Sequence, residues 1–289
     1  MSSPKLHHYV PRFYLKSFAD HKEQFWVWNK DHKNSFKGNP YGVAAENYFY
    51  RVPEFVESET DPLFLEYDLA NLEAKAAVIL KQWFERLESL EPMQKLEMED
   101  EERHIISYFI IIQFFRTADQ RDILAIFAET KGGYESELSP EERIDLHAYF
   151  LVTSDLIMEM TSRIESSIWL FAKNNTETPF WTSDNPVCFK TGDNRMWLKG
   201  PGIMSEGTYV VFPLSPKYIL YCKEPTFWEK ISAANNALSP VEFSTEMVEH
   251  ENAGQVFSCK RFVISSKNEF SFANEFVETI GTDIYAPDS

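Results

Sequence analysis

The hydrophobic pattern of the chain changes its period twice. Residues 24–30 are rich in aromatic and β-branched side chains, and the turn-forming residues after them predict coil and short strands over residues 1–60. Over residues 61–173 apolar side chains recur at every third or fourth position, which predicts helices. Short strand-like runs return over residues 174–289, so the chain is expected to combine helices and strands in separate segments.

Three long helices are expected in the middle segment. The first begins at Asp61, with a proline at its first helical position. The second covers about residues 94–130 with an interruption near residues 98–101. The third begins where Ser139 caps its first turn and continues to about Lys173.

The C-terminal segment alternates strand-like and helical patterns. The strand-like runs are residues 180–182, 209–212, 218–222 and 261–264, and the helical patterns are residues 226–237 and 244–257. We predict an α+β fold in which the helical middle packs against a mainly antiparallel sheet. The C-terminal part and short N-terminal strands form that sheet, and residues 1–289 make a single domain.

Composition narrows the class of protein. A chain of 289 residues with 44% hydrophobic content can bury a sizeable core. The net charge of −17 argues against a broadly basic nucleic-acid-binding surface and against binding to a membrane surface, although a local basic patch is still compatible with it. No apolar run of about 18 residues is present, which predicts no transmembrane helix. Three cysteines without a C-x-x-C pair, and a start unlike a signal peptide, predict a cytoplasmic protein.

The first twenty residues are unusually aromatic for the start of a chain. They also contain His7, His8 and Arg12. Because disordered termini are normally poor in aromatic residues, we expect this segment to pack into the fold. Adjacent side chains of an extended segment point to opposite sides, so at most one of the two histidines should enter a common site. We assign that place to His8, and the alternative is that both histidines are packing or surface residues.

Polar side chains occur at helical positions where burial or pairing is expected. Glu66 and Glu73 lie two turns apart and share one face, where they could hold a divalent cation or an arginine, or simply face solvent. Gln113 and Arg116 fall within and just after a long apolar run. A buried guanidinium needs an anionic partner, so Arg116 forms either an internal ion pair with one of the two glutamates or a clamp on a phosphate or carboxylate.

Four short polar side chains follow a strand-like run at Thr182, Ser183, Asp184 and Asn185. One interpretation is a purely structural turn. The other makes Asp184 a metal ligand or general base and gives the other three side chains the task of orienting a substrate. Ser183 lacks a glycine-flanked nucleophile elbow and the chain has no glycine-rich phosphate loop, which disfavours a hydrolase triad and a nucleotide-binding fold.

These motifs together resemble a known family, the bacterial domain-of-unknown-function family 4238. The resemblance rests on His8-Tyr9-Val10-Pro11-x-Phe13-Tyr14-Leu15-x-x-Phe18, on the helix with Glu66 and Glu73, on Gln113-x-x-Arg116, and on Phe180-x-Thr182-Ser183-Asp184-Asn185-Pro186-Val187. It spans nearly the whole chain and implies a single bacterial cytoplasmic domain. It implies no activity, because none is settled for the family.

The residue types favour a metal-dependent phosphodiester hydrolase, such as a nuclease acting as a toxin or phage-defence effector. In this hypothesis Mg²⁺ or Mn²⁺ lowers the pKa of its bound water and arginines stabilise the charge of the transition state. The metal ligands are Glu66, Glu73, Asp184 and His8. The catalytic groups are Asp184, His8 and Arg116, and the substrate-binding groups are Arg12, Gln113, Thr182, Ser183 and Asn185.

Two alternatives remain open. The first is a non-catalytic module in which Arg12, Arg116 and the turn at Asp184 recognise a small anionic ligand or nucleotide within an aromatic pocket. The partner is thus a small anionic ligand or a nucleic-acid phosphate. The second is a buried polar network that fixes the N-terminal segment on the helices and loses stability when one partner is removed. The sequence leaves the oligomeric state undetermined.

Overall fold

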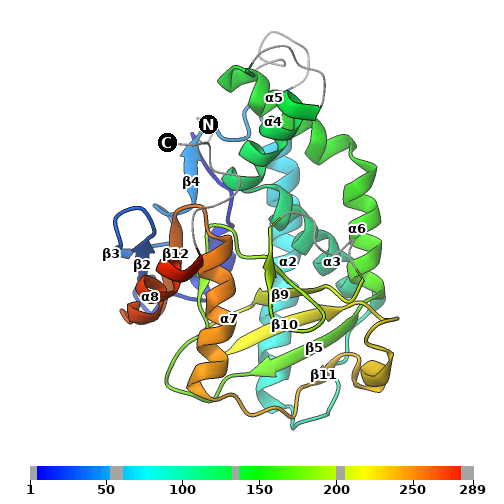
Figure 1. The fold of residues 1–289 in the computed structure, drawn as a ribbon. Helices are drawn as coiled ribbons and strands as arrows, with labels where there is room; N and C mark the ends of the chain where they lie inside the picture. The colour runs from blue at the N-terminus through cyan, green and yellow to red at the C-terminus, as the bar shows by residue number, and fades with distance from the viewer. Residues whose placement is uncertain (1–4, 53–60, 132–136, 200–205, 281–289) are drawn as a thin grey trace.

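The N-terminal segment contributes strands to two small sheets and one short helix. Figure 1 shows the computed structural model, which describes residues 5–52, 61–131, 137–199 and 206–280. The elements are β1 (Leu6–His8), α1 (Arg12–Lys16), β2 (Phe25–Asn29), β3 (Asn34–Gly38) and β4 (Ala45–Asn47). The sequence pattern predicts the short strands, but it does not predict helix α1. This helix starts directly after Pro11, which has an extended backbone and occupies the N-cap position.

Five helices, where the sequence pattern predicts three, occupy the middle of the chain. They are α2 (Phe64–Ser89), α3 (Asp100–Phe115), α4 (Ala118–Lys131), α5 (Pro140–Thr153) and α6 (Asp155–Ser166). The second predicted helix was wrong in its bounds, because residues 94–99 are not helical and the break falls after α3. The break follows Phe115, and Thr117 then offers its hydroxyl to the N–H of Gln120 at the start of α4.

The predicted helix starts are right in one case and displaced in another. Ser139 and Glu142 form the expected capping box at the start of α5. Asp61 does not cap α2 directly, because its carboxylate accepts a hydrogen bond from the N–H of Leu63 and the helix begins after that turn. The third helix does not reach Lys173, since Ser154 is extended and separates α5 from α6.

Strands and three further helices make up the rest of the described chain. The strands are β5 (Ile168–Lys173), β6 (Thr182–Ser183), β7 (Cys188–Lys190), β8 (Trp197–Leu198), β9 (Tyr209–Pro213), β10 (Tyr218–Lys223), β11 (Ala237–Leu238) and β12 (Phe262–Ser265). The helices are η3 (Glu229–Ala234), which is a 3₁₀ helix, α7 (Thr245–Ser258) and α8 (Ser271–Ile280). β5 replaces the predicted end of the third helix, because its short apolar run is compatible with either element by periodicity alone.

The described strands form three sheets, where the sequence predicts one. A six-stranded sheet has the order β11-β5-β10-β9-β7-β8 and is antiparallel except where β11 pairs with β5. A four-stranded sheet, β3-β2-β12-β6, combines N-terminal with C-terminal strands, and β1 pairs with β4 alone. Mainly antiparallel sheets beside a helical middle confirm the α+β class.

The six-stranded sheet separates two apolar layers. Phe171, Phe212 and Leu220 face the main core, where Trp83 of α2 and Phe109 of α3 pack against the sheet. The residues next to them in the strands, such as Ile219 and Val211, face a second layer with Val248 of α7. This alternation is the period of two that a strand imposes on its side chains. Among the described helices none has the length and apolar content needed to cross a membrane.

Candidate functional site

Arg116 lies at the centre of a buried polar cluster at the end of α3. Its side chain is 1% exposed. Nη1 donates to Glu73 Oε1 at 2.8 Å, Nη2 donates to the carbonyl of His8 at 2.8 Å, and Nε donates to the Tyr50 hydroxyl at 3.0 Å. We call these four residues the Arg116 network. This arrangement agrees with the interpretation that Arg116 forms an internal ion pair, and its partner is Glu73.

Three segments that are distant in sequence build this network. α2 supplies Glu73 from its third turn, and the pairing of β1 with β4 holds the His8 segment extended. Tyr50 donates its hydroxyl hydrogen to the carbonyl of Arg116 at 2.9 Å, so donor and acceptor roles are both used. Burial raises the pKa of Tyr50 to about 12, against the effect of Arg116. The phenol therefore stays neutral and acts as a hydrogen-bonding group.

The two histidines diverge, as an extended segment requires. His7 is fully buried, its Nδ1 accepts the Tyr50 N–H at 2.9 Å, and Nδ1 lies 3.8 Å from Glu66 Oε2. His8 is half-buried, and its Nε2 lies 3.2 Å from the carbonyl oxygen of Tyr41. Burial lowers the pKa of His8. His8 thus reaches Arg116 through its backbone, while the imidazole near a carboxylate belongs to His7.

Glu66 and Glu73 both face Arg116, as their seven-residue spacing predicts, but their environments differ. Glu73 forms the ion pair, whereas Glu66 is not hydrogen-bonded to the guanidinium among the described contacts. Burial raises the pKa of Glu66 to about 7, Arg116 lowers it, and the neighbouring Glu73 raises it further. Glu66 is therefore a carboxyl group that titrates near neutral pH.

An open groove adjoins the exposed side of the Arg116 network. It has a volume of about 440 Å³ and lies between α1 and α2, so we call it the α1–α2 groove. Its polar lining consists of Arg12, Lys16, Tyr41 and Glu73, and alanines of α2 line its floor. The Arg12 guanidinium carbon and Lys16 Nζ lie 5.4 and 5.5 Å from the centroid of the Tyr41 ring.

Gln113 connects the end of α3 to the N-terminal segment. Its Nε2 donates to the carbonyl of Tyr9 at 3.0 Å, and its side chain is fully buried. Its Oε1 has no hydrogen-bond partner among the described residues. The contact fixes the segment that carries His8, so Gln113 supports the Arg116 network without lining the groove.

Asp184 lies in a second polar cluster, which anchors the start of β12. Oδ1 accepts the N–H of Lys260 at 2.9 Å, and Oδ2 accepts those of Arg261 and Phe262 at 2.8 and 2.9 Å. Its exposed fraction is 2%. Burial raises the pKa of Asp184 to about 6, although the three N–H groups lower it. Both oxygens are therefore engaged in holding backbone.

The neighbours of Asp184 are also engaged in hydrogen bonds, mostly with other side chains. The Thr182 hydroxyl lies 2.8 Å from the Tyr14 hydroxyl, and the Ser183 hydroxyl donates to Gln255 at 2.8 Å. Asn185 Nδ2 donates to a carboxylate oxygen and to a backbone carbonyl, at 3.2 and 3.1 Å. We call Thr182–Asn185 with these contacts the Asp184 network. All four side chains are at most 4% exposed.

The break between α3 and α4 separates the two networks. Arg116 belongs to the first, and the next residue, Thr117, donates its hydroxyl to Asn185 Oδ1 at 3.4 Å in the second. The expected metal ligands are thus divided, with Glu66, Glu73 and His8 on one side and Asp184 on the other. Over the ranges that the structure describes, no three histidine, cysteine or acidic groups come together as a set for a metal ion. The residues do not fit Mg²⁺ or Mn²⁺ as one site.

Several groove and network residues were not identified from the sequence. Lys16 lies one helical turn after Arg12, a spacing that would have indicated a shared face if α1 had been predicted. Tyr41 and Tyr50 carry no such signal, because their positions depend on the loops around β4. Their proximity to Arg12 and Arg116 becomes visible only in the folded chain.

The fold and the two networks define an α+β protein whose N-terminal segment is held on a buried arginine. The chain belongs to the family described as protein of unknown function DUF4238, whose family model matches residues 6–269. No curated protein and no solved structure matches the chain.

Proposed function

We propose that the protein binds a small anionic ligand, of the phosphate or nucleotide class, in the α1–α2 groove. The observation that carries the proposal is the position of Arg12. Its guanidinium lines the groove and makes no hydrogen bond or ion pair within the described part of the chain. An exposed arginine at a concave surface is a suitable donor for bidentate contact with a phosphate or carboxylate.

The charges around the groove support an anionic ligand. The negative charge of Glu73 is balanced by Arg116 directly beneath it. Lys16 pairs with Glu23 at 2.6 Å, and Arg12 then adds a positive charge that pairs with no carboxylate of the described residues. In a chain with a net charge of −17, such a local cationic site would attract an anion that the rest of the surface repels.

The shape of the groove supports a ligand that also carries a flat or apolar part. The Tyr41 ring, 45% exposed, lies across from a floor of small side chains on α2. Glu73 is 24% exposed and can accept a hydrogen bond from a hydroxyl or amino group. A nucleotide combines these features, whereas inorganic phosphate would use the arginine alone.

The metal-dependent hydrolase, including its role as a nuclease or phage-defence effector, stays a prediction. It has less support from the geometry than ligand binding, because Asp184 is engaged with three backbone N–H groups away from the groove. The cytoplasmic location also stays a prediction. It is supported by three free and buried cysteines, which suit a reducing compartment.

Binding can be tested by calorimetry and thermal unfolding of the full chain with pyrophosphate and with AMP. We expect saturable stabilisation of the protein, which reaches about 2.7 kcal/mol when the ligand is present at 100 times its Kd. In Arg12→Gln the affinity should fall at least about tenfold, since a charge-assisted contact is lost. Arg195→Gln, which removes an exposed arginine away from the groove, is the matched control.

The outcome also separates binding from turnover. A ³¹P spectrum recorded after incubation with Mg²⁺ should show the probe intact if the protein is a binding module. Cleavage that is lost in Asp184→Asn would support the hydrolase instead. Equal affinity in Arg12→Gln and the parent protein would contradict the proposed groove.

A further inference from the structure

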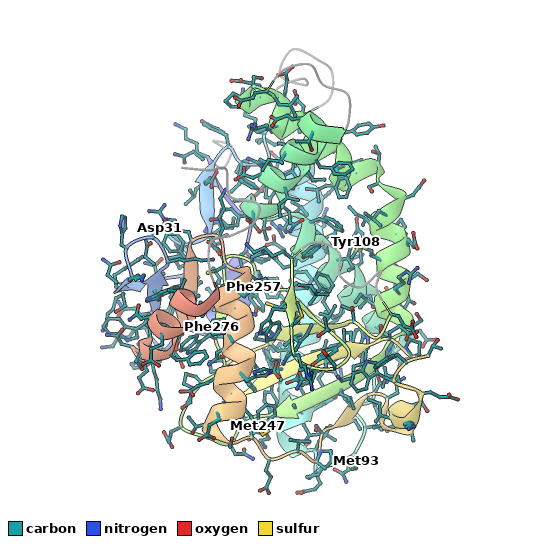
Figure 2. All side chains as sticks on the ribbon, viewed as in Figure 1. Asp31, Met93, Tyr108, Met247, Phe257 and Phe276 are labelled. Atoms are coloured by element: carbon teal, nitrogen blue, oxygen red, sulfur yellow. The ribbon has the colours of Figure 1, made fainter. Side chains whose placement is uncertain are left out.

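A second groove lies along α2, on the side that faces α3. The two helices pack next to each other (Figure 1), and two cavities of about 490 and 510 Å³ follow one another along the line between them. Tyr108 of α3, which is labelled in Figure 2, lines the first cavity. Lys75 and Ile105 line both cavities, so the two form one feature, which we call the α2–α3 groove.

The groove has the length of a short helix. Leu65 of α2 and Ile112 of α3 line its first cavity, and Val78 and Glu101 line its second, so the two helices run in opposite directions. The 13 residues from Leu65 to Val78 rise by about 20 Å, which is the length of about four helical turns. The lining residues belong to helices or helix caps and offer no strand edge. The groove therefore suits a helical partner better than an extended one.

Apolar side chains continue along the whole groove. Leu65 and Leu69 are buried at one end, and Ile79 is buried at the other. Val78, near Ile79, is 58% exposed, and Val152 of α5, which lines the opposite end, is 55% exposed. Covering these exposed side chains would remove apolar surface from water at both ends of the groove.

Acidic side chains border both ends of this apolar surface. Asp68 lies at the end near α5, and Glu99 and Glu101 lie at the start of α3. Over the ranges that the structure describes, none of these three carboxylates forms an ion pair. Glu102, in contrast, is paired with Arg86 at 3.0 Å. A partner that approaches the groove therefore meets unpaired negative charge at each end.

The cationic groups of the lining do not cancel this charge. Lys75 lies between the two ends, where its aliphatic stem adds to the apolar surface and its ammonium group remains in water. His104 is exposed, and its Nδ1 lies 3.0 Å from Glu165 Oε2. The two ends of the groove thus remain acidic.

We propose that the α2–α3 groove binds an amphipathic helix of another protein, with apolar residues on one face and lysines or arginines near both ends. The apolar face, with residues at positions i, i+3 or i+4, and i+7, covers the line from Leu65 to Val78. The basic residues pair with Asp68 at one end and with Glu101 at the other. The net charge of −17 disfavours a second copy of this chain as the partner, because two such chains repel each other.

The proposal can be tested on the full chain with a labelled peptide of fourteen residues. The peptide carries leucines on one helical face and lysines near both ends, and fluorescence anisotropy measures its affinity. We expect saturable binding. A peptide of the same composition, scrambled so that no apolar face forms, should bind at least about tenfold more weakly, and so should a peptide with glutamates in place of the lysines.

Matched variants locate the bound peptide. Val78→Asp and Val152→Asp should each weaken binding at least about tenfold, because each places a charge in an apolar contact. Val241→Asp, at a valine that is 49% exposed and lies outside the groove lining, is the control and should leave the affinity unchanged. All three variants gain one negative charge, so a general attraction between an acidic chain and a basic peptide would not separate them.

The parent protein alone can overturn the proposal, whether or not a variant folds. Equal affinity for the amphipathic and the scrambled peptide would do so, and so would equal affinity of Val78→Asp and the parent protein. Sedimentation of the chain without peptide tests the other occupant. A dimer that Val78→Asp dissociates would assign the groove to a second copy of the chain and contradict a basic helical partner.

Discussion

The Arg116 and Asp184 networks contain similar residue types but differ in their access to solvent. In the Asp184 network all four side chains from Thr182 to Asn185 are buried, and each carries hydrogen bonds to other parts of the chain. In the Arg116 network the inner groups are equally buried, but Glu73 is 24% exposed and opens onto a groove beside Arg12. The Arg116 network therefore has a side from which a ligand can approach.

This difference shows that residue type is a weak guide to a site. An aspartate after a strand suits a metal ligand or a general base, yet here its two oxygens hold three backbone N–H groups in place. An arginine after an apolar run suits a phosphate clamp, yet here Arg116 forms an internal ion pair with Glu73. The groups that remain available to a ligand lie at the edge of the α1–α2 groove, where side chains make fewer contacts within the chain.

The strongest test of the comparison is Asp184→Ala. It leaves three buried N–H groups without an acceptor, and at roughly 1–3 kcal/mol for each group the free energy of unfolding should fall by about 5 kcal/mol. Urea denaturation followed by circular dichroism measures the loss. Asp31→Ala, at an exposed position, is the control. A stable Asp184→Ala protein that loses a biological activity would instead place Asp184 in a functional site.

A slightly smaller loss is expected when the Arg116 network is cut. Arg116→Met leaves the Glu73 carboxylate without its partner, and breaking a buried pair of this kind should cost about 4 kcal/mol. Adding Glu73→Leu should recover part of this stability, because the double variant contains no uncompensated charge. A denaturation cycle over the two single variants and the double variant measures the coupling. Strict additivity would contradict the pairing of these two residues.

The pH dependence of stability tests Glu66, the carboxyl group beside the network. Its pKa is about 7 in the folded chain and 4.5 as the ordinary value, so its proton is bound more tightly in the folded state. The stability that it contributes is full below pH 4.5 and is lost as the pH rises through 7, by up to about 3 kcal/mol. Glu66→Gln should remove this slope and be the more stable protein at pH 8.

Comparing the two proteins isolates Glu66, because Asp184 also has a raised pKa and is present in both. Denaturation curves between pH 4 and 8 give the required free energies. An unchanged slope in Glu66→Gln would mean that this carboxyl group titrates normally and that the network is more hydrated than its contacts indicate.

The smallest effect on stability is expected at Arg12, in the α1–α2 groove. Arg12→Gln should change the free energy of unfolding by less than about 0.5 kcal/mol, since its side chain is exposed and unpaired in the described structure. The same variant should lose most of the stabilisation by pyrophosphate. Thermal unfolding with and without pyrophosphate shows both effects, and a large loss in the absence of ligand would assign Arg12 to the structural network.

Local patterns predicted which segments are helices or strands better than where these segments end. The period of α2, the capping box of α5 and the strands β9 and β10 all follow from neighbouring residues. The break after Phe115 does not, because no glycine or proline marks it among residues 116–122. It also separates two networks whose partners are distant in sequence. The division of the chain into domains stays a prediction.

The sequence by itself determined that Arg116 needs an anionic partner, that Glu66 and Glu73 share a face, and that the N-terminal segment packs into the fold. These conclusions depend on burial and helical spacing, which are local properties. Only the tertiary structure decided that Glu73 is the partner, 43 residues away, and that Asp184 is closed to solvent. Whether a polar side chain has a free side depends on what other segments bring to it, and that is set when distant parts of the chain pack together.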